Sequence, residues 1–288
     1  EGASVVGRLG WQDYAVIKPE QVSIVSDEYS AEEWLTALSS PGQTPYLALS
    51  QVARPMPGET LVVSSAAGAI GVYTVQLGLL SGMRVIGIAG GSRKTEFVTT
   101  ELGAHACVDY KSKSFKADLA SACHEGANIY FDLVGGETAD AVSEILAKNA
   151  KILMVGRVSA NNSNDPEWDP ANMRHVWSQE ATIYAFSRYS YKNMFPSVNA
   201  KIGRLLKQKL LKNRFLKNSY SSTNTSRSSK IHLHRPTTRG NRGWAPPAPK
   251  SMKTLRKTMP PQVPPPLVRE PPPTRGGELK GGKPMDMT

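Results

Sequence analysis

The chain has few cysteines: only Cys107 and Cys123 occur among its 288 residues. Two thiols cannot build a disulfide-stapled secreted scaffold or a zinc ribbon, so both classes of protein are excluded. A charged segment followed by an apolar stretch is also missing from the start of the given sequence, so no signal peptide is predicted. With no targeting segment visible, a cytoplasmic location is expected.

Long runs that would suit a lipid environment are lacking as well. Residues 61–83 carry no charge, and a run of this length can span a bilayer. Several serines and glycines, together with Thr74 and Gln76, make it too polar for a lipid-facing helix. A buried strand, a turn and a helix explain the run better, so no membrane association is expected.

A net positive charge is absent from most of the chain and is concentrated at its end. Residues 213–288 hold 15 Lys and Arg against 3 acids, which leaves 20 bases and 21 acids in residues 1–212. The same last segment holds 13 of the 21 prolines and many serines, without apolar periodicity. Such a composition cannot bury enough apolar surface to offset its conformational entropy, so a basic, Pro/Ser-rich disordered tail is predicted over 213–288.

Short apolar runs alternate with helical patterns through the middle of the chain. The runs predict strands, and the 3.6-residue patterns between them predict helices. This alternation is typical of an α/β protein with a doubly wound parallel sheet, the Rossmann architecture. Strands are predicted at 59–65, 84–89, 106–108, 128–134, 151–155 and 181–186, and helices at 69–80, 94–102, 115–123 and 137–146. An amphipathic helix is predicted over 196–212, and strands and turns are predicted over 1–25.

A glycine-rich turn lies between the first of these strands and the first helix. Residues 66–71 read AAGAIG, which is the G-x-G-x-x-G pattern with Ala in place of the first Gly. Gly68 lets the backbone approach a pyrophosphate, and Gly71 lets the helix pack closely on the sheet. The free N–H groups at the start of the helix, including those of Ala69 and Ile70, favour an anion. Alone the motif is weak, but at the head of six alternating elements it predicts a dinucleotide site.

The end of the second predicted strand indicates which dinucleotide binds. A site for NAD has an acid here for the ribose 2′-hydroxyl, whereas this chain reads AGGSRK over 89–94. Small residues such as Gly90 followed by Arg93 and Lys94 suit a 2′-phosphate, so NADP(H) is the predicted cofactor. The alternative is a solvated basic pair at a helix N-terminus, which the helix dipole disfavours unless an anion is bound.

Several stretches together resemble a known family. They are SSAAGAIG (64–71), RVIGIAGGSRKTEF (84–97), ELGAHACVDYKS (101–112), IYFDLVGG (129–136) and KILMVGRVS (151–159), with WQDYAV at 11–16. The combination is similar to the zinc-independent medium-chain dehydrogenase/reductases, in particular to the oxoprostaglandin reductase and alkenal double-bond reductase branch. The likeness covers about residues 5–212. It implies NADPH-dependent reduction of a carbon–carbon double bond conjugated to a ketone or aldehyde, with no metal, and it leaves a homodimer open.

The resemblance also implies roles for single residues. Lys94 and Tyr110 would contact the 2′-phosphate, and Val134 would lie in a loop beside the nicotinamide. Thr44 would line the nicotinamide side of the cofactor site. An equally favoured alternative is that its hydroxyl lies at the start of a helix. Tyr191 would donate a hydrogen bond to the carbonyl oxygen of the substrate. The favoured alternative is that Tyr191 is a partly buried tyrosine that only contributes to packing.

Four domains follow from these expectations. Residues 1–27 are interpreted as the end of a GroES-like catalytic β-domain, of which only a remnant is recognisable. Residues 28–187 form the NADP-binding domain, 188–212 return to the catalytic domain, and 213–288 form the tail. The chain departs from the family at Leu133, where an Asn is usual, at 158–162, which lacks a pocket tyrosine, and after Lys212, where a helix and a final strand are missing.

Two other functions remain open at this point. The incomplete β-domain favours a cofactor-binding remnant without turnover, because strand edges and the nicotinamide pocket would be left uncovered. Alternatively, the basic tail could bind nucleic acid through phosphate contacts. Few aromatic residues lie between the basic residues of the tail. In addition, translation in another reading frame would give a tail of the same composition. Nucleic-acid binding is therefore the least favoured of the three functions.

Overall fold

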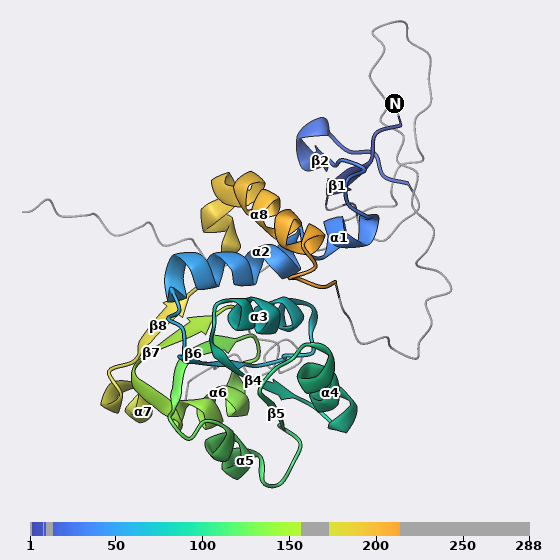
Figure 1. The fold of residues 1–288 in the computed structure, drawn as a ribbon. Helices are drawn as coiled ribbons and strands as arrows, with labels where there is room; N and C mark the ends of the chain where they lie inside the picture. The colour runs from blue at the N-terminus through green and yellow to red at the C-terminus, as the bar shows by residue number, and fades with distance from the viewer. Residues whose placement is uncertain (1, 8, 10–13, 157–172, 214–288) are drawn as a thin grey trace, which may run out of the picture. The chain divides into compact units, whose positions relative to one another are not determined.

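The computed structural model describes residues 2–7, 9, 14–156 and 173–213. Six strands form one parallel sheet in the order β5-β4-β3-β6-β7-β8 (Figure 1). Their bounds are Thr60–Val63 (β3), Arg84–Ala89 (β4), Ala106–Asp109 (β5), Ala127–Asp132 (β6), Leu146–Met154 (β7) and Thr182–Ala185 (β8). The chain winds outward from β3 in one direction and then from β6 in the other, so the predicted doubly wound sheet is confirmed.

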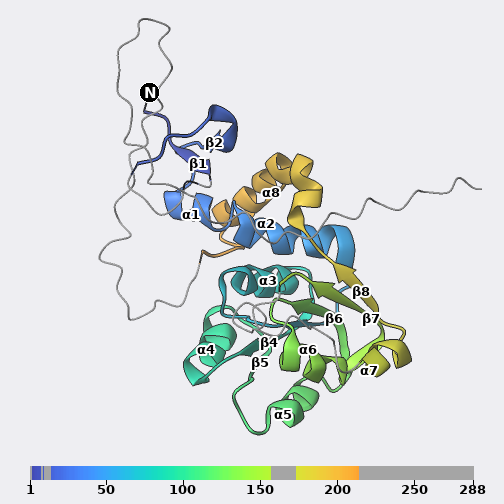
Figure 2. The ribbon, with the colours of Figure 1, turned by 180° about the vertical axis from the view of Figure 1, so that it is seen from behind.

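Helices cover both faces of this sheet, as Figures 1 and 2 show from opposite sides. One face is covered by α3, with α2 packed on α3 and α8 packed on α2, and the other face packs against α5, α6 and α7. The α-helices are Ala31–Leu35 (α1), Ser40–Leu47 (α2), Ala69–Leu80 (α3), Ser92–Glu96 (α4), Phe115–Ala122 (α5), Gly136–Ser143 (α6), Met173–Ser178 (α7) and Phe195–Lys207 (α8). Short 3-10 helices occupy Pro19–Gln21 and Arg188–Met194, and π-helices occupy Ala48–Ala53 and Phe97–Glu101.

The two hydrophobic cores follow directly from the alternation of side chains along each strand. Leu61 and Val63 of β3 join the core under α3, whereas Val62 between them joins the core under α5 and α6. In β6, Phe131 and Tyr130 are divided between the two cores in the same way. All four residues of β3 are buried, which explains why this strand reads as a continuous apolar run.

Some predicted boundaries were wrong. The helix expected over 137–146 ends at Ser143, because Leu146 already begins β7 and is buried in the second core. The helix expected over 94–102 starts earlier, at Ser92, and continues as a π-helix from Phe97. The helix expected over 196–212 ends at Lys207.

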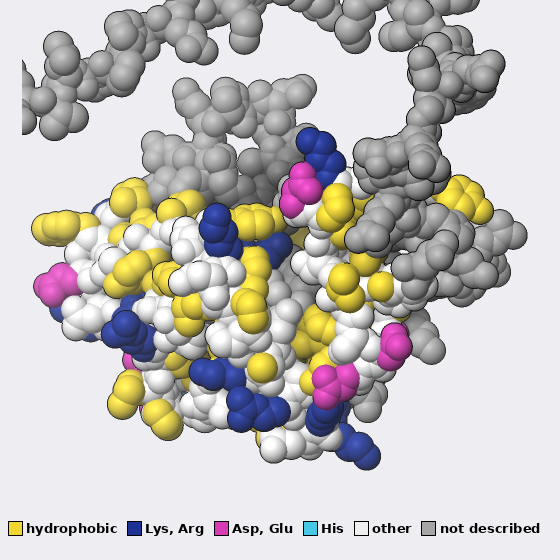
Figure 3. All heavy atoms as spheres, turned by 90° about the horizontal axis from the view of Figure 1, so that it is seen from above, with side chains coloured by type: hydrophobic (Ala, Val, Ile, Leu, Met, Phe, Trp, Pro, Cys, Tyr) yellow, Lys and Arg dark blue, Asp and Glu magenta, His cyan; other side chains and the backbone are white. Residues whose placement is uncertain are grey.

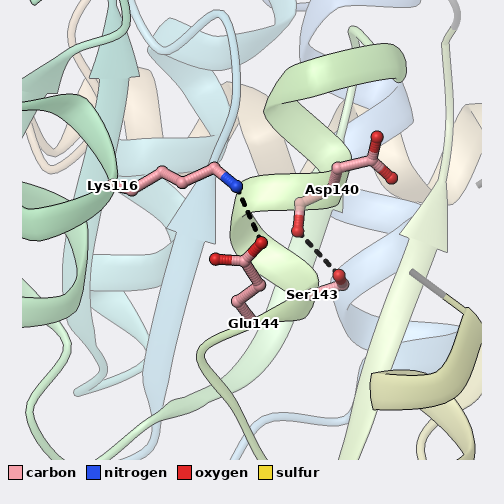
Figure 4. A network of polar contacts seen from close by, with 4 residues as sticks. All are labelled: Lys116, Asp140, Ser143 and Glu144. Atoms are coloured by element: carbon pink, nitrogen blue, oxygen red, sulfur yellow. Dashed lines mark hydrogen bonds and ion pairs between the residues drawn. The ribbon is translucent and has the colours of Figure 1, made fainter. Parts of the chain in front are cut away.

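The helices that cover the second face are joined by polar contacts at their ends. Lys116 of α5 forms an ion pair with Glu144, just after α6, at 2.7 Å (Figure 4). The Ser143 hydroxyl donates to the carbonyl oxygen of Asp140 at 2.7 Å and so closes the last turn of α6. The ion pair is largely exposed, so it orients the two helices and contributes little to stability.

The described residues near the N-terminus form a small antiparallel hairpin. Its strands, Val5–Gly7 (β1) and Val22–Ile24 (β2), are three residues each and have no fully buried side chain. A pair this short needs other elements to be stable. Strands were expected here, but the GroES-like interpretation of 1–27 stays a prediction, as do the domain boundaries at 27, 187 and 212.

The last described residues are held against α3. The buried Gln76 side chain donates to the carbonyl oxygen of Lys212 at 3.0 Å and accepts from its backbone N–H at 2.8 Å. Asn213 accepts hydrogen bonds from the hydroxyls of Tyr73 and Thr36. The predicted tail from 214 onward and the departure at 158–162 lie outside the described residues. None of the helices in the described ranges combines the length and the apolar character needed to cross a bilayer.

Candidate cofactor site

A cleft of about 380 Å³ opens at the carboxyl edge of the sheet, where the strand order reverses. Ligands of open α/β sheets bind at this point, because the loops after the two central strands separate here. The turns that follow β3, β4, β5 and β6 all contribute to its wall. The lining residues are Ser65, Ala67, Gly68, Ile88, Ala89, Gly90, Lys94, Tyr110, Val134 and Thr138.

The turn between β3 and α3 brings the start of a 12-residue helix to this cleft. Ser65 adopts a left-handed conformation with φ +50°, and the Gly68 N–H donates to its carbonyl oxygen at 2.8 Å. A Cβ on Gly68 would lie 2.7 Å from the Ser65 hydroxyl oxygen, and one on Gly71 would press on the backbone of Ala66. Small residues are therefore required, and the first N–H groups of α3 are left available for an anion.

Two further predicted residues of this turn do not line the cleft. Ala69 is exposed and Ile70 is half-buried, and neither belongs to the lining side chains. Only their backbone N–H groups, in the first turn of α3, remain candidates for phosphate contacts.

The wall on the β4 and β5 side carries the cationic and phenolic groups. Lys94 in α4 and Tyr110 directly after β5 both line the cleft. The Tyr110 ring lies over Gly90, where a Cβ would be 2.7 Å from the ring carbon Cε1. Gly90 thus leaves the space that the ring occupies, and Lys94 and Tyr110 are both part of the cleft wall.

A buried polar network fixes the loop after β6. One carboxylate oxygen of Asp132, a residue that is 1% exposed, accepts from the N–H groups of Val134 and Gly135 and from the Tyr130 hydroxyl, each at 2.9 Å. The Ser64 hydroxyl lies 3.3 Å from the same oxygen. Burial raises the pKa of Tyr130 well above its usual value, so its hydroxyl stays protonated and donates to Asp132. Asp132 therefore caps the turn that brings Val134 to the cleft.

Leu133, which stands where the family has Asn, does not face the cleft. Its side chain is 6% exposed and belongs to the hydrophobic core under α3. Its backbone N–H donates to the Ser64 hydroxyl at 2.8 Å.

Two predicted residues lie elsewhere. Thr44 is buried inside α2, four positions after the first residue of that helix, so the alternative of a helix-start hydroxyl was wrong, and its role beside the nicotinamide stays a prediction. Tyr191 stacks on Phe186, with ring centroids 5.8 Å apart and planes at 19°, and it packs against the core. Neither residue lines the cleft. The geometry at Tyr191 therefore favours the packing interpretation over that of a donor to substrate.

Sequence reasoning missed Ser65 and Thr138, which line the cleft together with Tyr110 as its hydroxyl-bearing residues. Ser65 could have been found, because it directly precedes the glycine-rich turn. Thr138 gives no such signal, since it is the third residue of α6 and reaches the cleft only through the position of that helix.

A larger cleft of about 1070 Å³ lies between the hairpin and helices α1, α2 and α8, and shares no lining residue with the first. Arg188 donates there to Gln43 at 2.8 Å, and Gln43 donates to Asn199 at 2.9 Å. We place the candidate site at the smaller cleft, because only that one lies at the carboxyl edge of the sheet.

Metal ligands do not gather in this site. Within the described ranges, no three His, Cys, Asp or Glu residues lie close enough together to hold an ion. The expectation of metal-free chemistry stays a prediction.

Comparison with known proteins agrees with this geometry. Residues 69–203 match the family model described as zinc-binding dehydrogenase. The chain is 36% identical over 190 residues to the NADPH-dependent curcumin reductase of Escherichia coli, covering 64% of this chain and 55% of that protein. It superposes on the crystal structure of CurA in complex with NADPH from Vibrio vulnificus with a TM-score of 0.61 and 32% identity, over 66% of this chain and 59% of that one.

The chain is therefore similar to the medium-chain dehydrogenase/reductase family. A further relative in this family is the NADP(+)-dependent 2-alkenal reductase of Nicotiana tabacum, 29% identical over 68% of this chain and 58% of that protein. The chain therefore spans somewhat more than half the length of the relatives that it matches.

Proposed function

We propose that this chain binds NADPH in the 380 Å³ cleft and reduces the carbon–carbon double bond of an α,β-unsaturated ketone or aldehyde. The observation that carries the cofactor part is that Lys94 and Tyr110 both line the cleft, after a β4 strand that ends without an acid. A cation and a phenol suit a 2′-phosphate, whereas an acid would suit a free ribose hydroxyl. The relatives named for NADPH-dependent reductions support the reaction class.

The residues of the cleft fit the cofactor at three places. The first N–H groups of α3 would hold the pyrophosphate, with Gly68 allowing close approach. Lys94 and Tyr110 would hold the 2′-phosphate. The loop with Val134, fixed by Asp132, would border the nicotinamide.

Bound NADPH would supply a hydride to the β-carbon of the double bond. Negative charge then develops on the carbonyl oxygen of the substrate, which needs a hydrogen-bond donor, and the α-carbon needs a proton. Tyr191 was the predicted donor, but its stacking on Phe186 gives that role no support. The residue that donates to the substrate is therefore not part of the proposal.

Cofactor binding is tested by quenching of tryptophan fluorescence with NADPH and NADH. We expect NADPH to bind at least about tenfold more tightly, because one charge-assisted phosphate contact is worth about 1.5–3 kcal/mol. Lys94→Ala should remove most of this difference, and Lys116→Ala, which removes a lysine from the far helix α5, should not. Equal affinities for the two cofactors in the unchanged chain would contradict the 2′-phosphate site.

Turnover is tested separately, by the consumption of NADPH with a simple alkenal or enone. Consumption that depends on the substrate supports the reductase. Binding of NADPH without consumption would instead identify the chain as a cofactor-binding remnant.

Nucleic-acid binding has less support. In Figure 3, the Lys and Arg side chains on the face seen from above are spread among hydrophobic ones instead of forming one basic patch. Retention on DNA that is sensitive to salt, and that vanishes when 213–288 are deleted, would favour this alternative. The homodimer and the cytoplasmic location stay predictions.

A further inference from the structure

We propose that Asp109 is a positioning residue for cofactor selectivity. It joins the loop that leads into α4, the helix with Lys94, to the loop that contains Tyr110. The proposal rests on the proposed function, because it concerns how this chain would distinguish NADPH from NADH. Asp109 itself does not line the cleft, so its effect on the cofactor would be indirect.

The geometry of one carboxylate oxygen carries the proposal. Oδ1 of Asp109 accepts from the backbone N–H of Gly91 at 2.9 Å and from the backbone N–H of Lys111 at 2.9 Å. Gly91 belongs to the loop after β4, and Lys111 belongs to the loop after β5. The carboxylate thus continues the pairing of the two strands beyond their last aligned residues, Ala89 and Asp109.

Gly91 and Lys111 do not line the cleft themselves, but each is bonded or adjacent to a residue that does. Gly91 is the residue that precedes α4, and its N–H is fixed while its carbonyl oxygen accepts from the N–H of Lys94 at 3.0 Å. Gly91 has φ +84°, a conformation that glycine adopts without strain and other residues rarely adopt. On the other side, Tyr110 lies between Asp109 and Lys111, so the turn around it is closed by the same oxygen.

The two amide donors also keep the carboxylate ionised. The N–H of Gly91, followed by that of Lys111, holds the pKa of Asp109 below its ordinary value. An ionised acceptor forms the stronger kind of hydrogen bond. If Asp109 acted only through its charge, it would weaken the binding of NADPH, because a negative charge close to a 2′-phosphate repels it.

The test compares three single variants of the full chain. Asp109→Ala removes the acceptor, whereas Asp109→Asn removes the charge and keeps an oxygen in the same place. Asp118→Ala is the matched control: it removes an acid that bonds only locally, to the Ser114 hydroxyl at 2.7 Å, at the start of α5. The dissociation constants for NADPH and NADH are measured for each variant, together with amide hydrogen exchange of residues 90–112 without cofactor.

We expect Asp109→Ala to weaken NADPH binding by about tenfold and to change NADH binding by less than about twofold. Asp109→Asn should restore most of the NADPH affinity, and Asp118→Ala should change neither constant. Exchange at Gly91 and Lys111 should become faster in Asp109→Ala without any cofactor present.

Three results would overturn the proposal. They are unchanged NADPH affinity in Asp109→Ala, tighter NADPH binding in both Asp109 variants, and an equal loss for NADPH and NADH. The proposed function fails by a different result, namely no preference for NADPH in the unchanged chain, and the proposal about Asp109 would fall with it.

Discussion

At the scale of single residues, Gly90 controls the shape of the cleft end where the phosphate is expected. The Tyr110 side chain occupies the space in which a Cβ at position 90 would lie, at 2.7 and 2.9 Å from two ring carbons and 3.0 Å from the hydroxyl oxygen. Tyr110 is 50% exposed, so its ring can move outward without disrupting the core. A change at position 90 should therefore act on the cofactor and not on folding.

We predict that Gly90→Ala weakens NADPH binding by about tenfold and leaves the free energy of unfolding nearly unchanged. The affinity is measured by fluorescence titration and the stability by urea denaturation. In a Tyr110→Ala background the same change should have no further effect, because the ring that it displaces is gone. An equal loss in both backgrounds would show that Gly90 acts through another contact.

The two cysteines predict how stability depends on pH. Burial raises the pKa of the Cys107 thiol to about 12 and that of Cys123 to about 11, from the ordinary value of 9.0. Above pH 9 the unfolded chain loses these protons, while the folded chain keeps them up to about pH 11. The free energy of unfolding should therefore fall over this range by about 1.4 kcal/mol per pH unit for each thiol.

Urea denaturation at several pH values checks this dependence. In the double variant Cys107→Ala, Cys123→Ala, the free energy of unfolding should fall less steeply with pH. Some of the fall should remain, because burial also raises the pKa of Tyr73, to about 12. An identical slope in the two chains would contradict the assignment to the thiols.

At the scale of elements, the loop after β6 depends on a single buried carboxylate. One oxygen of Asp132 is the acceptor for Tyr130, Val134 and Gly135 together. Removing it leaves buried donors without partners, which costs more than the loss of any one of the bonds.

We predict that Asp132→Ala lowers the free energy of unfolding by about 3 kcal/mol, measured by urea denaturation. Tyr130→Phe, which removes one donor and leaves the loop bonds intact, should cost about 1 kcal/mol. Asp132→Asn keeps an acceptor oxygen and should fall between the two. If Asp132→Ala were no more costly than Tyr130→Phe, the capping role would be wrong.

The elements that could be predicted from sequence are those with a regular apolar pattern. Helix α3 and strand β4 have the predicted bounds, because each is buried nearly throughout and ends at a glycine turn or a polar residue. Helix α2 was not predicted, since Pro41, Gly42 and Pro45 within it oppose a helix locally. Its burial between α3 and α8 overrides this preference.

The site divides in the same way. Lys94 could be predicted from the residues, because it lies in the basic pair that follows the end of β4, whereas Tyr110, directly after β5, was assigned by resemblance. Thr44 and Tyr191 were assigned by resemblance alone, and their positions depend on packing between distant segments, which sequence spacing does not encode. Asp109 was visible only as part of a motif, and its contact with Gly91 needs the pairing of β4 and β5.

At the scale of the whole molecule, the described fold is completed by contacts at Lys212 and Asn213. We predict that a chain ending after Asn213 binds NADPH within about twofold of the full chain. A chain ending after Gln208 should be less stable, because it loses the buried Leu211, worth about 2 kcal/mol, and both bonds to Gln76. Circular dichroism and urea denaturation measure the two truncations. Loss of folding in the longer one would contradict this prediction.

The central claim is that the cleft receives an adenosine with a 2′-phosphate at Lys94 and Tyr110. Calorimetry with adenosine 2′,5′-bisphosphate and with adenosine 5′-monophosphate tests it most directly, because neither ligand contains the nicotinamide or requires turnover. We predict that the bisphosphate binds at least about tenfold more tightly and that Lys94→Ala removes the difference. Equal binding of the two ligands to the unchanged chain would contradict the claim.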